Sequence, residues 1–261
     1  MCLLSSVGRN ASNLRDDAKT VQILLNLNTA PNALTPPLAE DGHNGNKTIA
    51  SIEAFQTRIN AAQKPDGRVD PHGATLRALQ AGMPHGFSAA KLQGIMIHAT
   101  RTNIARYFPL LRSNMEASEI NTPLRMAHFL AQLGHESAEF RYTEEIASGA
   151  AYEGRTDLGN IESGDGVRFK GRGLIQLTGR ANYKKYGTAR TADYLTGSNP
   201  GLLSTDPAIA VHVSCWFWTS HSLNTLADSD NITAITKVIN GGHNGLADRK
   251  IKLGRAKFFL T

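Results

Sequence analysis

The stretch Thr122-Pro-Leu-Arg-Met-Ala-His-Phe-Leu-Ala-Gln-Leu-Gly-His-Glu-Ser137 predicts an amphipathic helix with a carboxylic acid at its end. Thr122 can cap the helix with its side-chain oxygen, and Pro123 takes the first helical position, where proline is favoured. Apolar residues then recur at helical spacing and form one stripe, which consists of Met126, Phe129, Leu130 and Leu133. Glu136 falls on the same stripe, and we expect the helix to end near Ser137.

Glu136 is a candidate general acid, because it lies on a helix face that is meant for burial. Desolvation disfavours the charged form of a carboxyl group and raises its pKa, so that a protonated carboxyl can donate to a leaving oxygen at neutral pH. The alternative is a glutamate at a helix end that is solvated or paired with an arginine. This helix alone does not decide between the two interpretations.

A second carboxyl group is needed for acid–base work, and four glutamates follow within 17 residues: Glu139, Glu144, Glu145 and Glu153. Carboxyl groups that cleave a glycosidic bond with inversion lie ~6.5–9.5 Å apart. In a continuous helix Glu145 would lie ~13.5 Å along the axis from Glu136. The helix must therefore end and the chain must fold back, after which either Glu144 or Glu145 could face Glu136.

The histidines of this helix do not predict a metal site. His135-Glu136 begins like the zinc-protease motif, but Glu139 stands where that motif needs its second histidine. His128 and His135 share a helix face, yet two histidines without a third convergent ligand are more often structural. We expect neither a metal nor an organic cofactor.

A second informative stretch is Phe169-Lys-Gly-Arg-Gly-Leu-Ile-Gln-Leu-Thr-Gly-Arg-Ala-Asn-Tyr183. Its glycines lack the spacing of a phosphate-binding loop, and we expect them to allow a close approach of the backbone. Gln176 and Thr178 are two residues apart, so in an extended segment they would offer an amide and a hydroxyl to one face. A structural turn with polar caps is the alternative.

Two further segments are candidates for the walls of a cleft. Trp216-Phe-Trp218 could stack on sugar rings, but aromatic residues two apart in an apolar run favour a place in the core. Ile239-Asn-Gly-Gly-His-Asn-Gly245 is a glycine-rich turn with amide and imidazole side chains, and we expect it to form a cleft wall.

The bulk composition is that of a globular protein, with 261 residues, 41% hydrophobic residues and a net charge of +6. Basic charge draws a protein to polyanions, but lysines and arginines do not alternate with aromatic residues here, so nucleic acid is not favoured. Cys2 and Cys215 are expected to be free thiols. No apolar run has the length of a secretory signal or a transmembrane helix, so we expect neither, and no membrane insertion.

The first 82 residues predict a small three-helix domain. Asp16 and Asp17 can cap a first helix, a loop follows over residues 28–47, Thr48 can cap a helix from Ile49 to Asn60, and Ala74–Ala81 forms a third. Residues 83–87 fall in a Gly- and Pro-rich segment and form the expected linker. The larger domain covers residues 88–261 and starts with a helical pattern from Ala90 to Leu110.

Three ordered motifs, His135-Glu-Ser137, Phe169 to Tyr183 and Ile239-Asn-Gly-Gly242, resemble family 19 glycoside hydrolases, the chitinase-like group that includes many phage endolysins. The resemblance covers roughly residues 88–261 and implies a mainly α, lysozyme-like, bilobed catalytic domain. It implies that Glu136 is the general acid, that Glu145 is the general base and that Thr178 positions the nucleophilic water. Residues that contact the substrate by the same matching are Gln176, Asn182 and Asn240.

The substrate expectation also rests on resemblance. Gly179-Arg180-Ala181 replaces the aromatic residues of plant-type chitinases and resembles the endolysin branch, which acts on peptidoglycan. Residues 41–70 resemble a peptidoglycan-binding module in the segments Asp41-Gly42, Gly45, Lys47-Thr48-Ile49, Phe55-Gln56 and Pro65-Asp-Gly-Arg-Val-Asp70.

We therefore expect a monomeric peptidoglycan hydrolase that is made in the cytoplasm and reaches the cell wall through a phage holin or a bacterial secretion system. The alternatives are a chitinase acting on N-acetylglucosamine polymers, a wall-binding protein without turnover, and a metal-dependent amidase or peptidase.

Overall fold

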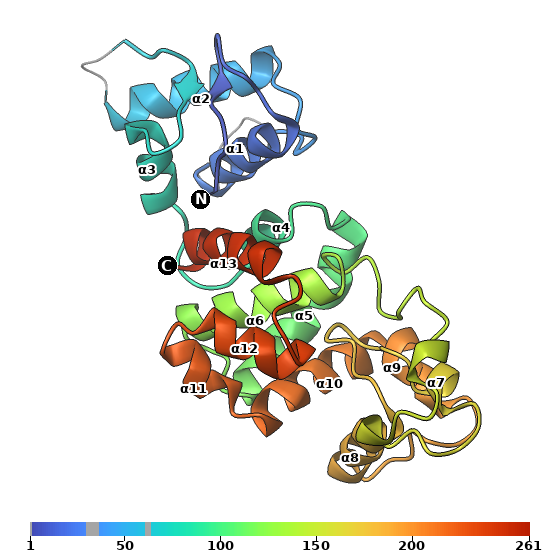
Figure 1. Cartoon of the computed structure of the whole chain (residues 1–261). Helices are drawn as coiled ribbons and strands as arrows, with labels where there is room; N and C mark the ends of the chain where they lie inside the picture. Colours follow the sequence, from blue (N-terminus) through green and yellow to red (C-terminus); the bar gives the residue numbers. More distant parts are fainter. Residues whose placement is uncertain (1, 30–36, 61–63) are drawn as a thin grey trace. The chain divides into compact units, whose positions relative to one another are not determined.

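The computed structural model describes residues 2–29, 37–60 and 64–261 (Figure 1), so residues 30–36 of the predicted loop lie outside the described part. The described chain is mainly α, as predicted, with thirteen α-helices and one two-stranded sheet. It divides into two compact units, Met1–Ile97 with Lys257–Thr261 and His98–Ala256. The predicted linker at residues 83–87 lies before this division and remains a prediction. Among the described helices, none combines the length and the apolar character that a membrane span requires.

The first unit contains the three predicted helices and one more. They are α1 (Arg15–Leu27), α2 (Asn46–Ile59), α3 (Ala74–Ala81) and α4 (Ala89–Ile95). Strand β1 (Val7–Gly8) pairs antiparallel with β2 (Arg68–Val69), with Val7 opposite Val69. Apolar side chains from these elements form a buried core, which includes Val21, Leu24, Ile52, Phe55 and Leu79.

Both predicted helix caps in this unit are wrong, because tertiary hydrogen bonds use the side chains instead. Helix α1 begins at Arg15, and Asp17 accepts hydrogen bonds from the Leu4 and Ser5 amides at 3.0 and 2.7 Å. Helix α2 begins at Asn46 after Gly45, so Thr48 lies inside its first turn. The Thr48 hydroxyl is buried and accepts a hydrogen bond from Gln22 Nε2 at 3.3 Å.

The second unit contains most of the helices. They are α5 (Arg101–Ala117), α6 (Pro123–Glu136), α7 (Asp165–Arg168), α8 (Arg180–Arg190), α9 (Leu202–Thr205), α10 (Pro207–Ser220), α11 (Leu223–Asp228), α12 (Ile232–Asn240) and the greater part of α13 (Leu246–Leu260). Three short 3-10 turns add η1 (Ala150–Tyr152), η2 (Thr156–Leu158) and η3 (Asn199–Gly201). The pattern from Ala90 to Leu110 is not one helix, because α4 ends at Ile95 and Thr100 caps α5 by accepting from the Asn103 amide.

Helix α6 agrees closely with its prediction. Thr122 accepts a hydrogen bond from the Arg125 amide at 3.3 Å, Pro123 begins the helix and Ser137 follows its last residue. Phe129, Leu130 and Leu133 are fully buried, and the Phe129 ring packs edge-on against Trp218 at 5.3 Å between centroids. This apolar face anchors the helix in the core, while its C-terminal end reaches the pocket described below.

The chain turns back directly after α6, as the carboxylate spacing requires. Ala138, Glu139 and Phe140 all have left-handed backbone angles, with φ of 47°, 58° and 68°. The left-handed region of backbone angles is unfavourable for residues other than glycine. Three such residues in a row need stabilising contacts from their surroundings. Ser137 supplies part of that support, since its hydroxyl donates to the Leu133 carbonyl and accepts from the Phe140 amide at 2.9 Å.

Candidate active site

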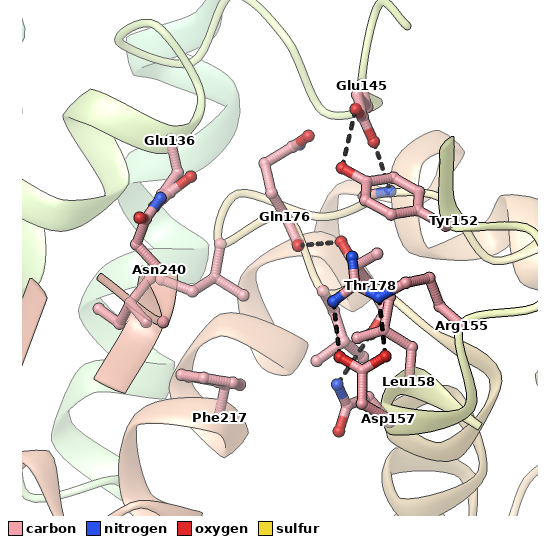
Figure 2. A pocket seen from close by; sticks show the side chains of 16 residues that line it. Glu136, Glu145, Tyr152, Arg155, Asp157, Leu158, Gln176, Thr178, Phe217 and Asn240 are labelled. Atoms are coloured by element: carbon pink, nitrogen blue, oxygen red, sulfur yellow. Dashed lines mark hydrogen bonds and ion pairs between the residues drawn. The ribbon is translucent and has the colours of Figure 1, made fainter. Parts of the chain in front are cut away.

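A pocket of about 610 Å³ in the second unit brings together all six of the predicted site residues, although the roles assigned to them remain predictions. Figure 2 shows Glu136 and Asn240 on one side, Glu145 and Tyr152 on another, and Gln176 between them. The pocket is lined by Glu136, Glu145, Tyr152, Arg155, Asp157, Leu158, Gly171, Ile175, Gln176, Leu177, Thr178, Asn182, Phe217, Ile239, Asn240 and Gly241.

Glu136 ends α6 and keeps 16% of its side chain exposed at the pocket. Its Oε1 accepts a hydrogen bond from Arg249 Nη2 at 2.5 Å, and the Arg249 side chain is fully buried. Arg249 also donates to the Gln132 side-chain oxygen. The two interpretations of Glu136 in the sequence therefore do not exclude each other, because it lies on the buried stripe and is paired with an arginine.

Arg249 did not stand out in the sequence, although a signal for it exists. It lies at i, i+4 and i+7 with Leu253 and Ala256, which are both buried in α13. An arginine on an otherwise apolar helix face needs a buried acidic or polar partner. That pattern predicts that Arg249 forms a buried ion pair. It does not indicate that the acidic partner is Glu136, which lies 113 residues earlier in the chain.

The two histidines of α6 each have a carboxylate partner of their own. His128 Nε2 lies 2.7 Å from Asp230 Oδ1, and His135 Nδ1 lies 2.7 Å from Asp248 Oδ2. In residues 2–29, 37–60 and 64–261, no three His, Cys, Asp or Glu side chains gather as metal ligands would.

Glu144 and Glu145 are adjacent in the chain but have different surroundings. Glu144 lies 2.7 Å from Lys170 Nζ and 2.9 Å from Arg172 Nε, and it accepts a hydrogen bond from Ser204. Burial by itself would raise the pKa of Glu144, but the hydrogen bonds from Lys170 and Arg172 outweigh it and lower the pKa to about 2. Glu144 is therefore an ion-pair residue, and Glu145 is the glutamate of the two that lines the pocket.

Glu145 is held by neutral donors. Tyr152 Oη donates to Glu145 Oε1 at 3.0 Å, and the Gly171 amide donates to Oε2 at 3.2 Å (Figure 2). The backbone amide of Glu145 also donates to the Gly171 carbonyl at 2.9 Å. These contacts join the segment after α6 to the second informative stretch of the sequence.

Gln176 and Thr178 both line the pocket, but the segment is not extended. Arg172 and Leu177 form an antiparallel bridge that closes a turn, and Gln176 has a left-handed φ of 58° within it. The Thr178 hydroxyl donates to the Gln176 carbonyl at 3.0 Å. A Cβ at Gly171 would lie 2.9 Å from Gln176 Oε1, so this glycine does permit the close approach that the sequence suggested.

The aromatic segment of α10 is divided between the core and the pocket. Trp218 is fully buried, as the core interpretation predicted, and Trp216 packs against Tyr186 at 5.2 Å. Phe217 instead lines the pocket and stacks on His221, with ring centroids 4.1 Å apart.

Three polar pocket residues come from short turns that sequence periodicity did not reveal: Tyr152, Arg155 and Asp157. Arg155 Nε and Nη2 donate to the two Asp157 carboxylate oxygens at 2.7 and 2.5 Å (Figure 2). Arg155 is the one cation among the described residues that line the pocket. Hydrogen bonds within η1 and η2 are local and leave no repeating apolar pattern that could have indicated these side chains.

Residues 125–244 match the family model for glycoside hydrolase family 19, described as chitinase class I. A family 19 domain-containing protein of Haemophilus influenzae is 28% identical over 57% of this chain and 86% of its own length. Two endochitinases of Arabidopsis thaliana are each 34% identical over 45% and 52% of this chain. The chain spans less than half of the length of these plant relatives, 39% and 45%.

Solved structures show the same fold. Chitinase C from Streptomyces griseus aligns with a TM-score of 0.53 and 23% identity, over 66% of this chain and 91% of that one. A bacterial family 19 chitinase aligns with a TM-score of 0.51 and 22% identity, over 66% and 93%. The chain thus has the lysozyme-like fold of family 19 over about two thirds of its length, together with an additional N-terminal helical region. It is an enzyme with a glycoside hydrolase family 19 domain in residues 125–244.

Proposed function

We propose that this enzyme is a peptidoglycan hydrolase that cleaves the β-1,4 glycosidic bond of the wall glycan by a single displacement with inversion. The observation that carries the proposal is the approach of Glu136 and Glu145 to one pocket from different sides, with Gln176 between them and Thr178 in the same pocket lining (Figure 2). Two carboxyl groups with room for a water between them are what an inverting glycosidase requires.

Glu136 acts as the general acid. Arg249 occupies Oε1, so the other oxygen, Oε2, carries the proton that passes to the glycosidic oxygen as the bond to the anomeric carbon breaks. After the transfer Glu136 is a carboxylate, and the buried guanidinium of Arg249 stabilises that charge. The ion pair with Arg249 therefore stabilises Glu136 in the charged form that it has after it has given up its proton.

Glu145 acts as the general base, and Thr178 orients the water. The Thr178 hydroxyl already donates to the Gln176 carbonyl, so its lone pairs can accept a hydrogen bond from the water. Glu145 takes a proton from that water, and the water oxygen forms the new bond to the anomeric carbon. Attack on the face opposite to the leaving group inverts the configuration.

The other pocket side chains suit an N-acetylated sugar. Asn182 donates to the Thr178 carbonyl at 2.8 Å and keeps its own side-chain oxygen as an acceptor. Gln176, Asn182 and Asn240 thus offer amide groups to hydroxyl and acetamido groups, and Phe217 offers an apolar ring face.

Several observations support peptidoglycan as the substrate. Wall glycan carries carboxylates on its peptide substituents. Arg155 is paired with Asp157 through Nε and Nη2, so its remaining guanidinium nitrogen, Nη1, would face them. The N-terminal segment, with its resemblance to a peptidoglycan-binding module, would hold the enzyme on the wall. Arg180 of the Gly-Arg-Ala segment pairs with Asp165 and Glu162 at 2.6 and 2.5 Å and does not line the pocket. The Gly-Arg-Ala segment therefore supports a peptidoglycan substrate only through its resemblance to the endolysin branch.

The same proposal includes the oligomeric state of the enzyme, its cofactor requirement and its route to the wall. It acts as a monomer without a metal or organic cofactor, and it reaches the wall after release by a holin or a secretion system. Size measurement in solution and activity in the presence of a chelator test the first two statements.

The test is mass analysis of the fragments released from purified peptidoglycan sacculi, together with the anomeric configuration of the first product by NMR. We expect disaccharide-peptide fragments with new reducing ends of inverted configuration. Release of peptides without new reducing ends would instead identify an amidase or peptidase, and binding without any fragment would identify a wall-binding protein.

A chitinase is the second candidate, because the plant relatives and the solved bacterial structures are named as chitinases. The same acid, base and water would serve an N-acetylglucosamine polymer. Cleavage of chitin oligomers at a much higher kcat/KM than sacculi would favour this candidate over a peptidoglycan hydrolase.

A further inference from the structure

We propose that Tyr152 is a positioning residue for the general base, holding the Glu145 carboxylate toward the water site through its phenol hydroxyl. This inference rests on the proposed function, because it assigns a partner to the base of that reaction. It is carried by the 3.0 Å hydrogen bond from Tyr152 Oη to Glu145 Oε1 and by the place of both side chains in the pocket lining.

The hydrogen-bond donors of Glu145 differ in charge from those of its neighbour Glu144. A carboxylate that has both a lysine and an arginine partner is strongly stabilised in its charged form, so it is a weak base toward a bound water. Glu144 has two such partners, Lys170 and Arg172, whereas the donors to Glu145 are a phenol and a backbone amide. The Glu145 carboxylate is therefore oriented at both oxygens, and no guanidinium or ammonium group among the described residues is paired with it.

Tyr152 is itself fixed by the turn that carries it. Gly149 precedes η1 with a left-handed φ of 85°, and a Cβ there would lie 2.5 Å from the Gly166 carbonyl. Asn160, which is fully buried, donates from Nδ2 to the Tyr152 carbonyl at 2.9 Å. The phenol thus reaches Glu145 from a backbone that is held on both sides.

The protonation state of Tyr152 is suited to this role. Burial raises the pKa of Tyr152, and the neighbouring Glu145 carboxylate raises it further. The phenol stays protonated, and so remains a donor, throughout the pH range in which a glycosidase works. Charged or titratable groups around the pair come from four segments: Glu144, Arg155, Lys170, Arg172 and Tyr183.

The experiment compares Tyr152→Phe with wild type in the full chain, using the substrate that wild type cleaves. A bell-shaped profile of kcat/KM against pH reports the base on its acid limb and the acid on its basic limb. Loss of a donor to the ionised carboxylate favours its protonated form, so the acid limb should move to higher pH by about 0.5–1 unit. We expect kcat to fall about tenfold, KM to change little and the basic limb to stay in place.

Tyr142→Phe is the matched control, since it removes a phenol hydroxyl from the same segment outside the pocket lining. It should leave both limbs and kcat unchanged. If Tyr152→Phe lowers the thermal unfolding midpoint, Tyr152→His, which retains a ring N–H donor, should restore part of the acid-limb position. An acid limb that coincides with wild type in the folded Tyr152→Phe enzyme would overturn the inference.

Glu136→Gln separates this inference from the proposed function. If Glu136→Gln abolishes cleavage while Tyr152→Phe has the wild-type profile, the reaction assignment stands and the role of Tyr152 is wrong. If Glu136→Gln retains full activity, the reaction assignment itself fails.

Discussion

Arg249 Nη2 lies 2.5 Å from Glu136 Oε1, so the proposed general acid of the pocket is tied to a fully buried guanidinium. The contact links the end of α6 to α13, two helices that lie 113 residues apart in sequence at these positions. The ion pair holds the Glu136 side chain in place, so the residue proposed as the general acid also contributes to the stability of the fold.

Glu136→Gln should lower kcat about 10²–10⁴-fold, because the amide cannot supply a proton to the leaving oxygen. The glutamine oxygen can still accept from Arg249, so circular dichroism should show a folded protein. Glu116→Gln, a change of an exposed glutamate on α5, is the matched control and should be as active as wild type. A Glu136→Gln enzyme that clears sacculi at near wild-type rate would remove Glu136 from the mechanism.

Arg249→Met should destabilise the fold by about 3–5 kcal/mol, since it leaves Glu136 and Gln132 near the core without their shared partner. Urea unfolding measures the change. The double variant Arg249→Met with Glu136→Gln should lose less than the sum of the two single variants, because no unpaired carboxylate remains. Strict additivity would show that the two side chains do not interact.

Glu144→Gln should make the enzyme less sensitive to acid. The folded pKa of Glu144, about 2, lies below its ordinary value of 4.5, so the stability from its ion pairs is present above pH 4.5. That stability disappears as the pH falls from 4.5 through 2. The thermal unfolding midpoint of wild type should therefore drop more steeply over this interval than that of Glu144→Gln, and parallel curves would contradict the role of Lys170 and Arg172.

Thr178→Val should lower kcat by about 10²-fold with little change in KM, because a water placed about 1 Å away from its productive position reacts far more slowly. Thr178→Ser retains the hydroxyl and should keep most of the activity. Steady-state kinetics on soluble glycan fragments distinguish the two variants, and equal losses in both would point to packing of the Thr178 methyl group instead.

Arg155→Gln should discriminate between the candidate substrates. If Arg155 faces the carboxylates of wall peptides, kcat/KM on peptidoglycan should fall several-fold and become less sensitive to salt. Cleavage of neutral chitin oligomers, where they are accepted, should change little. A uniform loss on both substrates would mean that Arg155 supports the pocket wall through Asp157 and does not select the substrate.

Features that depend on local pattern could be predicted from the sequence, and those that depend on distant partners could not. The cap, stripe and end of α6 follow from side chains within 16 residues, so they were predicted correctly. The choice between Glu144 and Glu145 depends on Lys170 and Arg172, which approach from 25 or more residues away and leave no trace in the local spacing.

The same reason explains the errors. Asp17 and Thr48 have the chemistry of helix caps, but hydrogen bonds to Ser5 and Gln22 use them elsewhere. Gln176 and Thr178 both line the pocket, but a bridged turn places them there and not the extended segment that their spacing predicts.

The bridges from Glu144 to Arg172 and from Arg172 to Leu177 have a mechanical consequence. They join the backbone beside Glu145 to the backbone beside Thr178, while Glu136 belongs to a helix packed in the core. If the pocket widens or narrows, Glu145 and Thr178 should move together, and Glu136 should stay with the core. In the proposed mechanism, such a movement would change the distance between Glu136 and Glu145 without disturbing the alignment of the attacking water.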